Sequence, residues 1–268
     1  MNVTANIGRK LRSSIIRAID DQTEEKFAEP PDIAAWDAER GGDREAVILA
    51  SAAGFLQQLD LKRLTELARR RRVQISISRS VGDFVAVHDG LMTVRPGAHI
   101  DESTTAFLHQ CCMIGAERTD VQDVLFLSDQ LVEVLIRALS PGVNDPHTAM
   151  LCLDWLRVGL VAFARRPPVP QVARHSPVLY RRVTLEVMLD RSFDRMRQYV
   201  STDRNVTLHA LDLLAAVATV ASSAAMVDAC TRQMQRLARS AQEQLSGSLA
   251  REEIETALGE ALRRTAAR

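Results

Sequence analysis

The stretch IGAERTDVQDVLFLSDQLVEVLIRALSPGVNDPHTAMLCLDWLRVGLVAF, residues 114–163, decides how the second half of the chain folds. Thr119 is followed three residues later by Gln122, a spacing typical of a capping box, and this predicts a helix that begins near Asp120. The apolar residues that recur at helical spacing are Val121, Val124, Leu125, Leu131, Val132, Leu135 and Leu139. The first part of the stretch is therefore expected to form a helix with one buried face.

A polar corner follows this helix. Pro141 and Gly142 are expected to end it, because proline cannot continue a helix and glycine commonly follows one. Asp145 precedes a proline and is pushed out of the helical region, whereas Pro146 suits a first helical position. The sequence therefore predicts a corner over residues 140–145 and a second helix that Asp145 caps.

The combination of ERTDVQD, IRALSPGVNDPHTA and CLDWL resembles the DUF2254 family of bacterial predicted membrane proteins. The soluble part of that family carries a similar R-T-x-x-D helix start and a similar A-L-S-P-x-x-N-D-P-x-T-A corner. The resemblance covers most of the chain, from about Ile7 to the C-terminal helices. It implies no established biochemical activity. It also implies membrane helices ahead of the matched region, so the chain is expected to be either the soluble part or a member without that anchor.

The composition argues against nucleic-acid binding, a disulfide framework and a zinc site. Basic and acidic residues number 34 each, so no overall positive field attracts nucleic acid. The four cysteines lie in apolar surroundings without CxxC spacing and are expected to be buried thiols, not a disulfide framework or a zinc site. They are Cys111, Cys112, Cys152 and Cys230. No cofactor is predicted.

No segment of the sequence is expected to be a transmembrane helix, and no signal peptide is predicted. The longest weakly polar run, residues 208–227, contains His209 and Asp212 and is rich in alanine and serine, which indicates a buried helix. The expected location is the cytoplasm, and the inner face of the cell membrane is a second option. Residues 7–27 form a predicted amphipathic helix with a basic first half. This helix is expected either to contact a membrane surface or membrane-domain partner, or to pack on the body or a second subunit.

The predicted fold class is α+β. Residues 1–44 are expected to hold the N-terminal helix and a linker, residues 45–98 a small β-rich module with one helix, and residues 99–268 a helical domain. In the β-rich module, residues 46–59 predict a strand or a strand pair kinked at Gly54, and Asp60 is expected to cap the helix. The GDFV pattern resembles half of a biotinyl or lipoyl barrel-sandwich. The turns lack the lysine that those carriers modify, so a covalent carrier role is disfavoured.

The candidate site residues fall at the helix start and at the corner. They are Arg118, Thr119, Asp120, Asp123, Arg137, Ser140, Asn144, Asp145 and Thr148. A structural interpretation explains them as caps and turn residues, with Arg137 binding the last carbonyls or Asp145. The alternative is a site for a small ligand or a hard divalent cation, which prefers oxygen ligands. Two antiparallel helices would keep Asp123 about 25 Å from Asp145, which disfavours one shared metal cage.

These patterns favour a non-enzymatic assembly or regulatory module that forms a homo-oligomer through its helical half. A small-ligand or divalent-cation domain centred on the corner is the alternative. A metal-assisted hydrolase that uses Asp120 and Asp123 is a third hypothesis. No catalytic residue is assigned, because Ser140 lacks a nucleophile motif and His147 is expected to be exposed.

Overall fold

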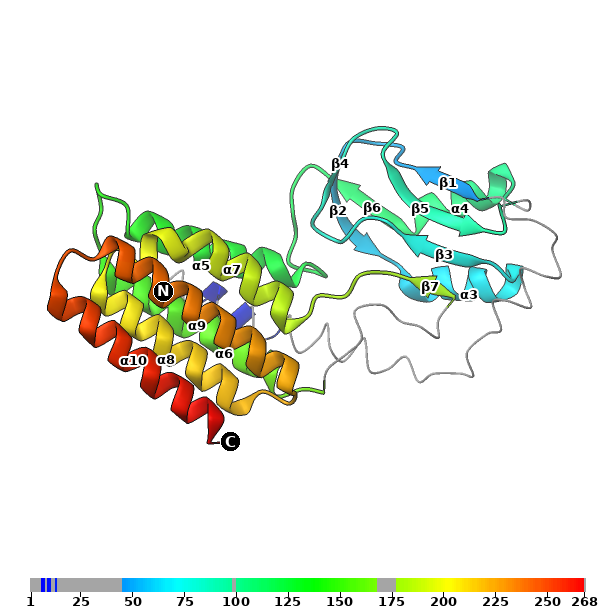
Figure 1. Cartoon of the computed structure of the whole chain (residues 1–268). Coiled ribbons are helices and arrows are strands. Elements are labelled where there is room, and N and C mark those ends of the chain that lie inside the picture. Colours follow the sequence, from blue (N-terminus) through cyan, green and yellow to red (C-terminus); the bar gives the residue numbers. More distant parts are fainter. Residues whose placement is uncertain are drawn as a thin grey trace. The chain divides into compact units, whose positions relative to one another are not determined.

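The computed structural model describes residues 6, 7, 9, 10, 13, 45–97, 100–167 and 177–267. The predicted amphipathic helix 7–27 and the linker up to residue 44 lie almost wholly outside the described residues. The chain divides into two compact units. A helical unit is built from Leu127–Val169 and Val183–Arg268, with Met1–Ile19 assigned to it, and a sheet unit from Asp20–Phe126 and Pro170–Arg182. Strands and helices are both present, so the α+β class is confirmed (Figure 1).

The described part of the sheet unit contains two open sheets and the helices α3 and α4. Its strands are β1 (Ala46–Leu49), β2 (Gly54–Leu59), β3 (Gln74–Ile77), β4 (Phe84–Val85), β5 (Gly90–Arg95), β6 (Cys112–Gly115) and β7 (Val178–Leu179). The strand orders are β1-β5-β3-β7 and β4-β2-β6. All pairs are antiparallel except β3 with β7. The described strands close no barrel, so the predicted barrel-sandwich likeness extends only to two small sheets.

Helix α3 (Leu61–Arg71) follows the prediction from sequence. The carboxylate of Asp60 accepts a hydrogen bond from the backbone amide of Arg63 at 3.0 Å and caps the helix. Leu64, Leu67 and Ala68 are buried on one face, in the same core as Ile75 of β3. Helix α4 (Glu102–Gln110) begins at Asp101, whose carboxylate accepts from the amide of Thr104 at 2.7 Å. Local capping chemistry therefore sets the start of both helices.

The strand at residues 112–115 corrects the expectation of a helical domain over residues 99–268, whereas residues 178–179 lie where the sequence allowed either a helix or a strand-to-helix turn. Residues 112–115 form β6, which pairs with β2 from Phe55↔Gly115 to Leu59↔Cys112. Residues 178–179 form β7, which lies parallel to β3 at Ile75↔Val178. Neither short apolar run shows strand alternation by itself. Pairing with a distant strand decides their conformation.

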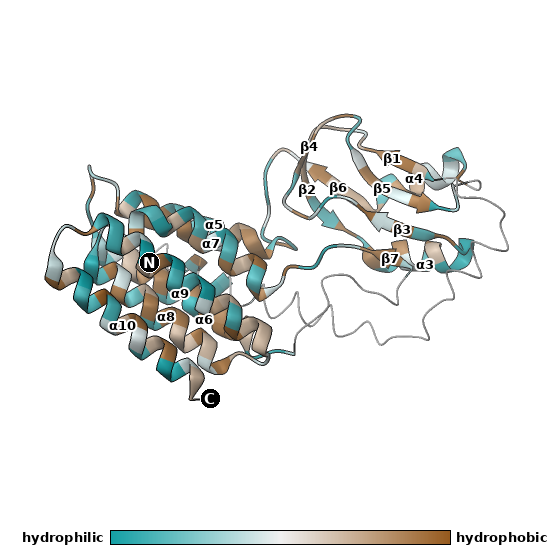
Figure 2. Cartoon of the chain, in the orientation of Figure 1, coloured by the Kyte–Doolittle hydropathy of each residue, from teal (hydrophilic) through white to brown (hydrophobic). Residues whose placement is uncertain are grey.

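From residue 124 onward, the described part of the helical unit contains six helices (Figure 1). They are α5 (Val124–Ala138), α6 (Pro146–Ala164), α7 (Leu185–Val200), α8 (Arg204–Val220), α9 (Ala224–Gln244) and α10 (Ser248–Ala266). Thr184, Asp203 and Ser223 cap α7, α8 and α9 through the amide three residues on. Figure 2 shows polar and apolar residues on each helix, as expected where one face of a helix is buried.

Helix α8 lies at the centre of this unit and packs against α6, α9 and α10. Its buried face is rich in small residues, including Ala210, Ala215 and Ala218, which allow neighbouring helices to approach closely. The predicted single helix over residues 208–227 is wrong in its extent. The chain turns at Ala221 and Ser222, and Ser223 starts α9 because its hydroxyl accepts from the amide of Met226.

Arginine–carboxylate pairs join these helices at their surfaces. Arg204 of α8 binds Glu253 of α10, and Arg232 of α9 binds Glu186 of α7. Arg264 of α10 binds Asp212 of α8 at 2.7 Å. Exposed pairs contribute little to stability individually, so burial of the apolar helix faces supplies most of the stabilisation of this unit.

No segment was expected to have the composition of a transmembrane helix, but α6 is long and apolar enough to cross a membrane, and it is the one helix of the described segments with that property. It packs against α8, and its buried residues include Leu153, Leu156 and Leu160. The core helix of a bundle has the same length and composition.

Candidate functional site

The RTDVQD segment forms a turn, and α5 begins four residues later than predicted. The predicted capping box is wrong. Asp123 caps the helix instead, because its carboxylate accepts from the amide of Phe126 at 3.0 Å. The side chain of Gln122 accepts from the amide of Leu59 at 2.9 Å and donates to the carbonyl of Leu59 at 3.3 Å. The hydroxyl of Thr119 is buried and makes no hydrogen bond to any described residue.

Asp123 and Arg118 form a buried ion pair within the sheet unit. Nε and Nη2 of Arg118 lie 2.8 and 2.7 Å from Oδ2 of Asp123. The side chain of Asp123 is 3% exposed and that of Arg118 is 17% exposed. The guanidinium also lies 5.0 Å from the centre of the Phe126 ring. This carboxylate is therefore bound to a cation and to a backbone amide, which leaves it poorly placed to act as a metal ligand or a base.

Gly82 makes room for this ion pair. Its φ is +94°, and a Cβ atom at this position would lie 2.2 Å from Oδ2 of Asp123. The amide of Gly82 donates to the carbonyl of Leu56 on β2 at 2.8 Å. The backbone of this turn is thus held close to the carboxylate, and only glycine fits there.

The predicted corner is confirmed. Asp145 caps α6, with Pro146 at the start of the helix. One carboxylate oxygen of Asp145 accepts from the amide of Thr148 at 3.0 Å, and the other accepts from its hydroxyl at 2.6 Å. These hydrogen bonds hold the pKa of Asp145 below its usual value, because they favour the charged form. Asn144 adopts a φ of +45°, which asparagine tolerates better than most residues.

Backbone hydrogen bonds close the corner. The amide of Asp145 donates to the carbonyl of Ala138 at 2.7 Å, and the amide of Asn144 donates to that of Ser140 at 2.9 Å. The hydroxyl of Ser140 donates to the carbonyl of Arg137 at 2.7 Å. The last carbonyls of α5 are thereby satisfied by the chain that follows it.

Arg137 does not take the role predicted for it. Its guanidinium binds Glu133 at 2.7 Å, one turn back on α5, and both side chains are largely exposed. An i,i+4 partner on the same helix face lies within easier reach than Asp145. His147 is exposed, as predicted.

The predicted site residues do not form one site. Arg118, Thr119, Asp120 and Asp123 precede α5, whereas the corner follows it, and a 15-residue helix is about 22 Å long. Within the described ranges, no three His, Cys, Asp or Glu side chains are grouped so that they could hold a metal ion. The two groups of motif residues therefore have separate local roles.

Sequence reasoning missed a buried carboxylate, Asp129 of α5. Both of its oxygens bind Arg191 of α7 at 2.8 to 3.1 Å, and Arg195 binds it at 2.8 Å. Asp129 is 7% exposed. The sequence does place this aspartate between the apolar Leu127 and Leu131 on the buried face of the helix, and that position could have indicated a buried carboxylate. Its two partners are 62 and 66 residues away in sequence, so the signal did not identify them.

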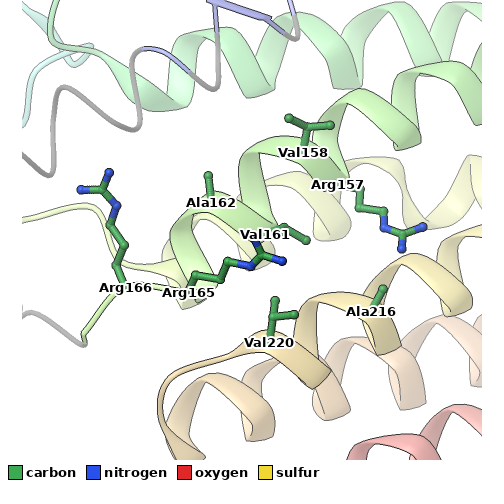
Figure 3. Close-up of a pocket in the computed structure, with 8 residues that line it drawn as sticks. All are labelled: Arg157, Val158, Val161, Ala162, Arg165, Arg166, Ala216 and Val220. Atoms are coloured by element: carbon green, nitrogen blue, oxygen red, sulfur yellow. The ribbon is translucent and has the colours of Figure 1, made fainter.

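A groove of about 500 Å³ lies between α6 and α8, and the sequence did not reveal it. Its apolar lining comes from both helices, and arginines stand at its rim (Figure 3). The lining residues are Arg157, Val158, Val161, Ala162, Arg165, Arg166, Ala216 and Val220.

The cysteines are poor nucleophiles. Burial raises the pKa of Cys112, Cys152 and Cys230 to about 12 and also raises that of Cys111. The thiolate is the reactive form, so these thiols are almost entirely protonated at neutral pH. All four are free, and three are fully buried.

We therefore expect the native chain to resist alkylation. Iodoacetamide at pH 8 should label the native protein far more slowly than the urea-unfolded protein, which should take up four labels by intact-mass measurement. Half-buried Cys112 should react first if any native labelling occurs. Rapid native labelling of Cys152 would contradict the packing of α6.

The chain is similar to one protein family and to uncharacterized mycobacterial proteins. The sequence model of DUF2254, described as a predicted membrane protein, matches residues 1–216. The uncharacterized proteins Mb1321c of Mycobacterium bovis and Rv1290c of Mycobacterium tuberculosis are each 34% identical to the chain over 111 residues. Each match covers 38% of this chain and 20% of the relative, so the matched region is a fifth of the length of these relatives. No solved structure matches the chain.

Proposed function

The chain belongs to the DUF2254 family of predicted membrane proteins, and from that premise we propose that it is a non-enzymatic assembly or regulatory module. In this proposal the module lies at the cytoplasmic face of a membrane and self-associates through its helical unit. Its role is to hold copies of a membrane-linked protein together.

One observation carries the proposal: the polar residues of the corner hold its shape, whereas its apolar tip faces solvent. Asp145, Ser140 and Asn144 direct their hydrogen bonds to the chain around them. Val143 at the tip is 62% exposed, and a Cβ atom on Gly142 would meet nothing within 4 Å. Val143 is thus free to contact another protein surface, and the hydrogen bonds of the corner already hold the loop that carries it.

The alternatives require these residues to give up existing contacts. A divalent cation at the corner would compete with Thr148 for both oxygens of Asp145. A hydrolase that uses Asp123 would need this carboxylate to leave Arg118 and the amide of Phe126. Each change would uncap a helix. The geometry therefore favours an interaction surface over a reaction centre.

The proposal predicts that Val143→Glu weakens self-association. A buried glutamate at an interface core loses its hydration, so the dissociation constant of the oligomer should rise at least about tenfold. Leu249→Glu is the matched control, because Leu249 lies on the same unit and is 67% exposed. Sedimentation velocity of the two variants, with thermal unfolding to verify folding, makes the comparison.

The control decides between a specific contact and general surface hydrophobicity. Loss of association in the Val143 variant alone supports the corner as the contact. Equal loss in both variants, or wild-type association in the Val143 variant, would contradict it.

A further inference from the structure

We infer that the groove between α6 and α8 binds an anionic phospholipid, with an acyl chain on its floor and the phosphate between Arg157 and Arg165. The inference draws on the proposed function only for the presence of a membrane. The residues that carry it are distinct from the corner, so the two proposals can fail separately.

The floor of the groove is apolar and open to a ligand. Val158, Val161 and Ala162 of α6 face Ala216 and Val220 of α8 across it (Figure 3). All five side chains are only partly buried. A volume of about 500 Å³ is within the range of small-molecule sites, which are mostly apolar with a few charged groups. This floor suits a hydrocarbon chain, because covering it removes apolar surface from water.

The charge at the rim is positive and only weakly neutralised. Arg165 makes no hydrogen bond or ion pair with another side chain in the described part of the protein. Nη1 of Arg157 lies 3.8 Å from Oδ2 of Asp212, which is its nearest carboxylate oxygen among the described residues. The other oxygen of Asp212 is bound by Arg264 at 2.7 Å. The groove therefore has more guanidinium charge than its neighbouring carboxylate can balance.

Arg157 and Arg165 border the groove at two points along α6. They are eight residues apart on or just after α6, about 12 Å along the axis, and long side chains can span that distance from both ends. In Figure 3 the side chain of Arg165 extends over the groove, that of Arg157 extends toward α8 near Ala216, and that of Arg166 points away from the groove. Guanidinium groups bind phosphate with two parallel hydrogen bonds, so a phosphate suits this rim.

The helix dipole explains an arginine at the rim of the groove but does not explain its apolar floor. Cations near the end of α6 also suit the negative end of its dipole, which explains Arg165. That effect needs no apolar groove and places no demand on α8. An inorganic anion would use the rim and leave the floor exposed, whereas a neutral hydrocarbon would leave the arginines without a partner. An anionic lipid uses both, and the family is described as a predicted membrane protein.

The test is calorimetric titration of the full chain with lysophosphatidylglycerol below its micelle concentration. Lysophosphatidylcholine and inorganic phosphate serve as separate probes. We expect saturable binding of the anionic lipid, with affinity at least about tenfold above that of either other probe. Arg157→Gln with Arg165→Gln should weaken binding at least about tenfold, and Val161→Gln should also weaken it by spoiling the floor.

A charge-matched control uses Arg239→Gln with Arg263→Gln, since both arginines are exposed on the same unit and neither lines the groove. Binding by the control should match the wild type. Equal binding of the zwitterionic lipid, equal binding of phosphate, or equal loss in the control pair would each overturn the inference. Sedimentation of the groove variant should match the wild type, which separates this result from failure of the assembly proposal.

Discussion

Gly82→Ala is expected to lower the free energy of unfolding of the sheet unit by about 3 kcal/mol. A non-glycine residue at strongly positive φ costs about 1–2 kcal/mol. The added Cβ would also lie 2.2 Å from Oδ2 of Asp123. The carboxylate cannot easily move away, because Arg118 and the amide of Phe126 hold it in a buried position. Urea titration followed by circular dichroism measures the change.

Gly142→Ala is the matched control for this prediction. A Cβ atom on Gly142 would meet nothing within 4 Å, and its φ is not positive. Its unfolding midpoint should stay at or slightly above that of the wild type, because alanine has less conformational freedom in the unfolded chain. In an Asp123→Ala background, Gly82→Ala should cost only the backbone strain, about 1–2 kcal/mol. Full additivity of the two substitutions would contradict the proposed contact.

Asp129→Ala is expected to destabilise the helical unit by about 2–3 kcal/mol. Removing one partner of a buried ion pair typically costs about 3–5 kcal/mol. The expected destabilisation is smaller for Asp129→Ala because the side chains of Arg191 and Arg195 are 42% and 46% exposed and retain part of their hydration. The loss removes the charged contact between α5 and α7. Chemical unfolding of the full chain provides the measurement.

Asp194→Ala is the control that separates the effect of burying the carboxylate from the effect of its charge. Asp194 also binds two arginines, Arg197 at 2.7 Å and Arg236 at 3.6 Å, but its side chain is 45% exposed. Its loss should cost less than about 1 kcal/mol. A cost for Asp194→Ala as large as that for Asp129→Ala would show that burial of Asp129 adds nothing.

Local sequence patterns predicted the elements whose boundaries are set by neighbouring residues. Asp60 before α3 and Asp145 with Pro146 before α6 both act over three residues or fewer. Such caps can be identified from sequence because the group that donates the hydrogen bond is close along the chain. The corner between α5 and α6 was predicted for the same reason.

Interactions between distant residues account for the elements that were predicted wrongly. Gln122 was expected to cap its own helix but binds the backbone of Leu59, 63 residues away. Residues 112–115 became a strand because the edge of β2 was available to pair with them. The partners of Asp129 and the groove between α6 and α8 also depend on how helices distant in sequence pack together. No local pattern specifies such contacts.

Sedimentation of the wild-type chain across micromolar concentrations tests the assembly role most directly. The account predicts that the weight-average mass rises with concentration above the 29.7 kDa of one chain. A single 29.7 kDa species at every concentration would contradict it.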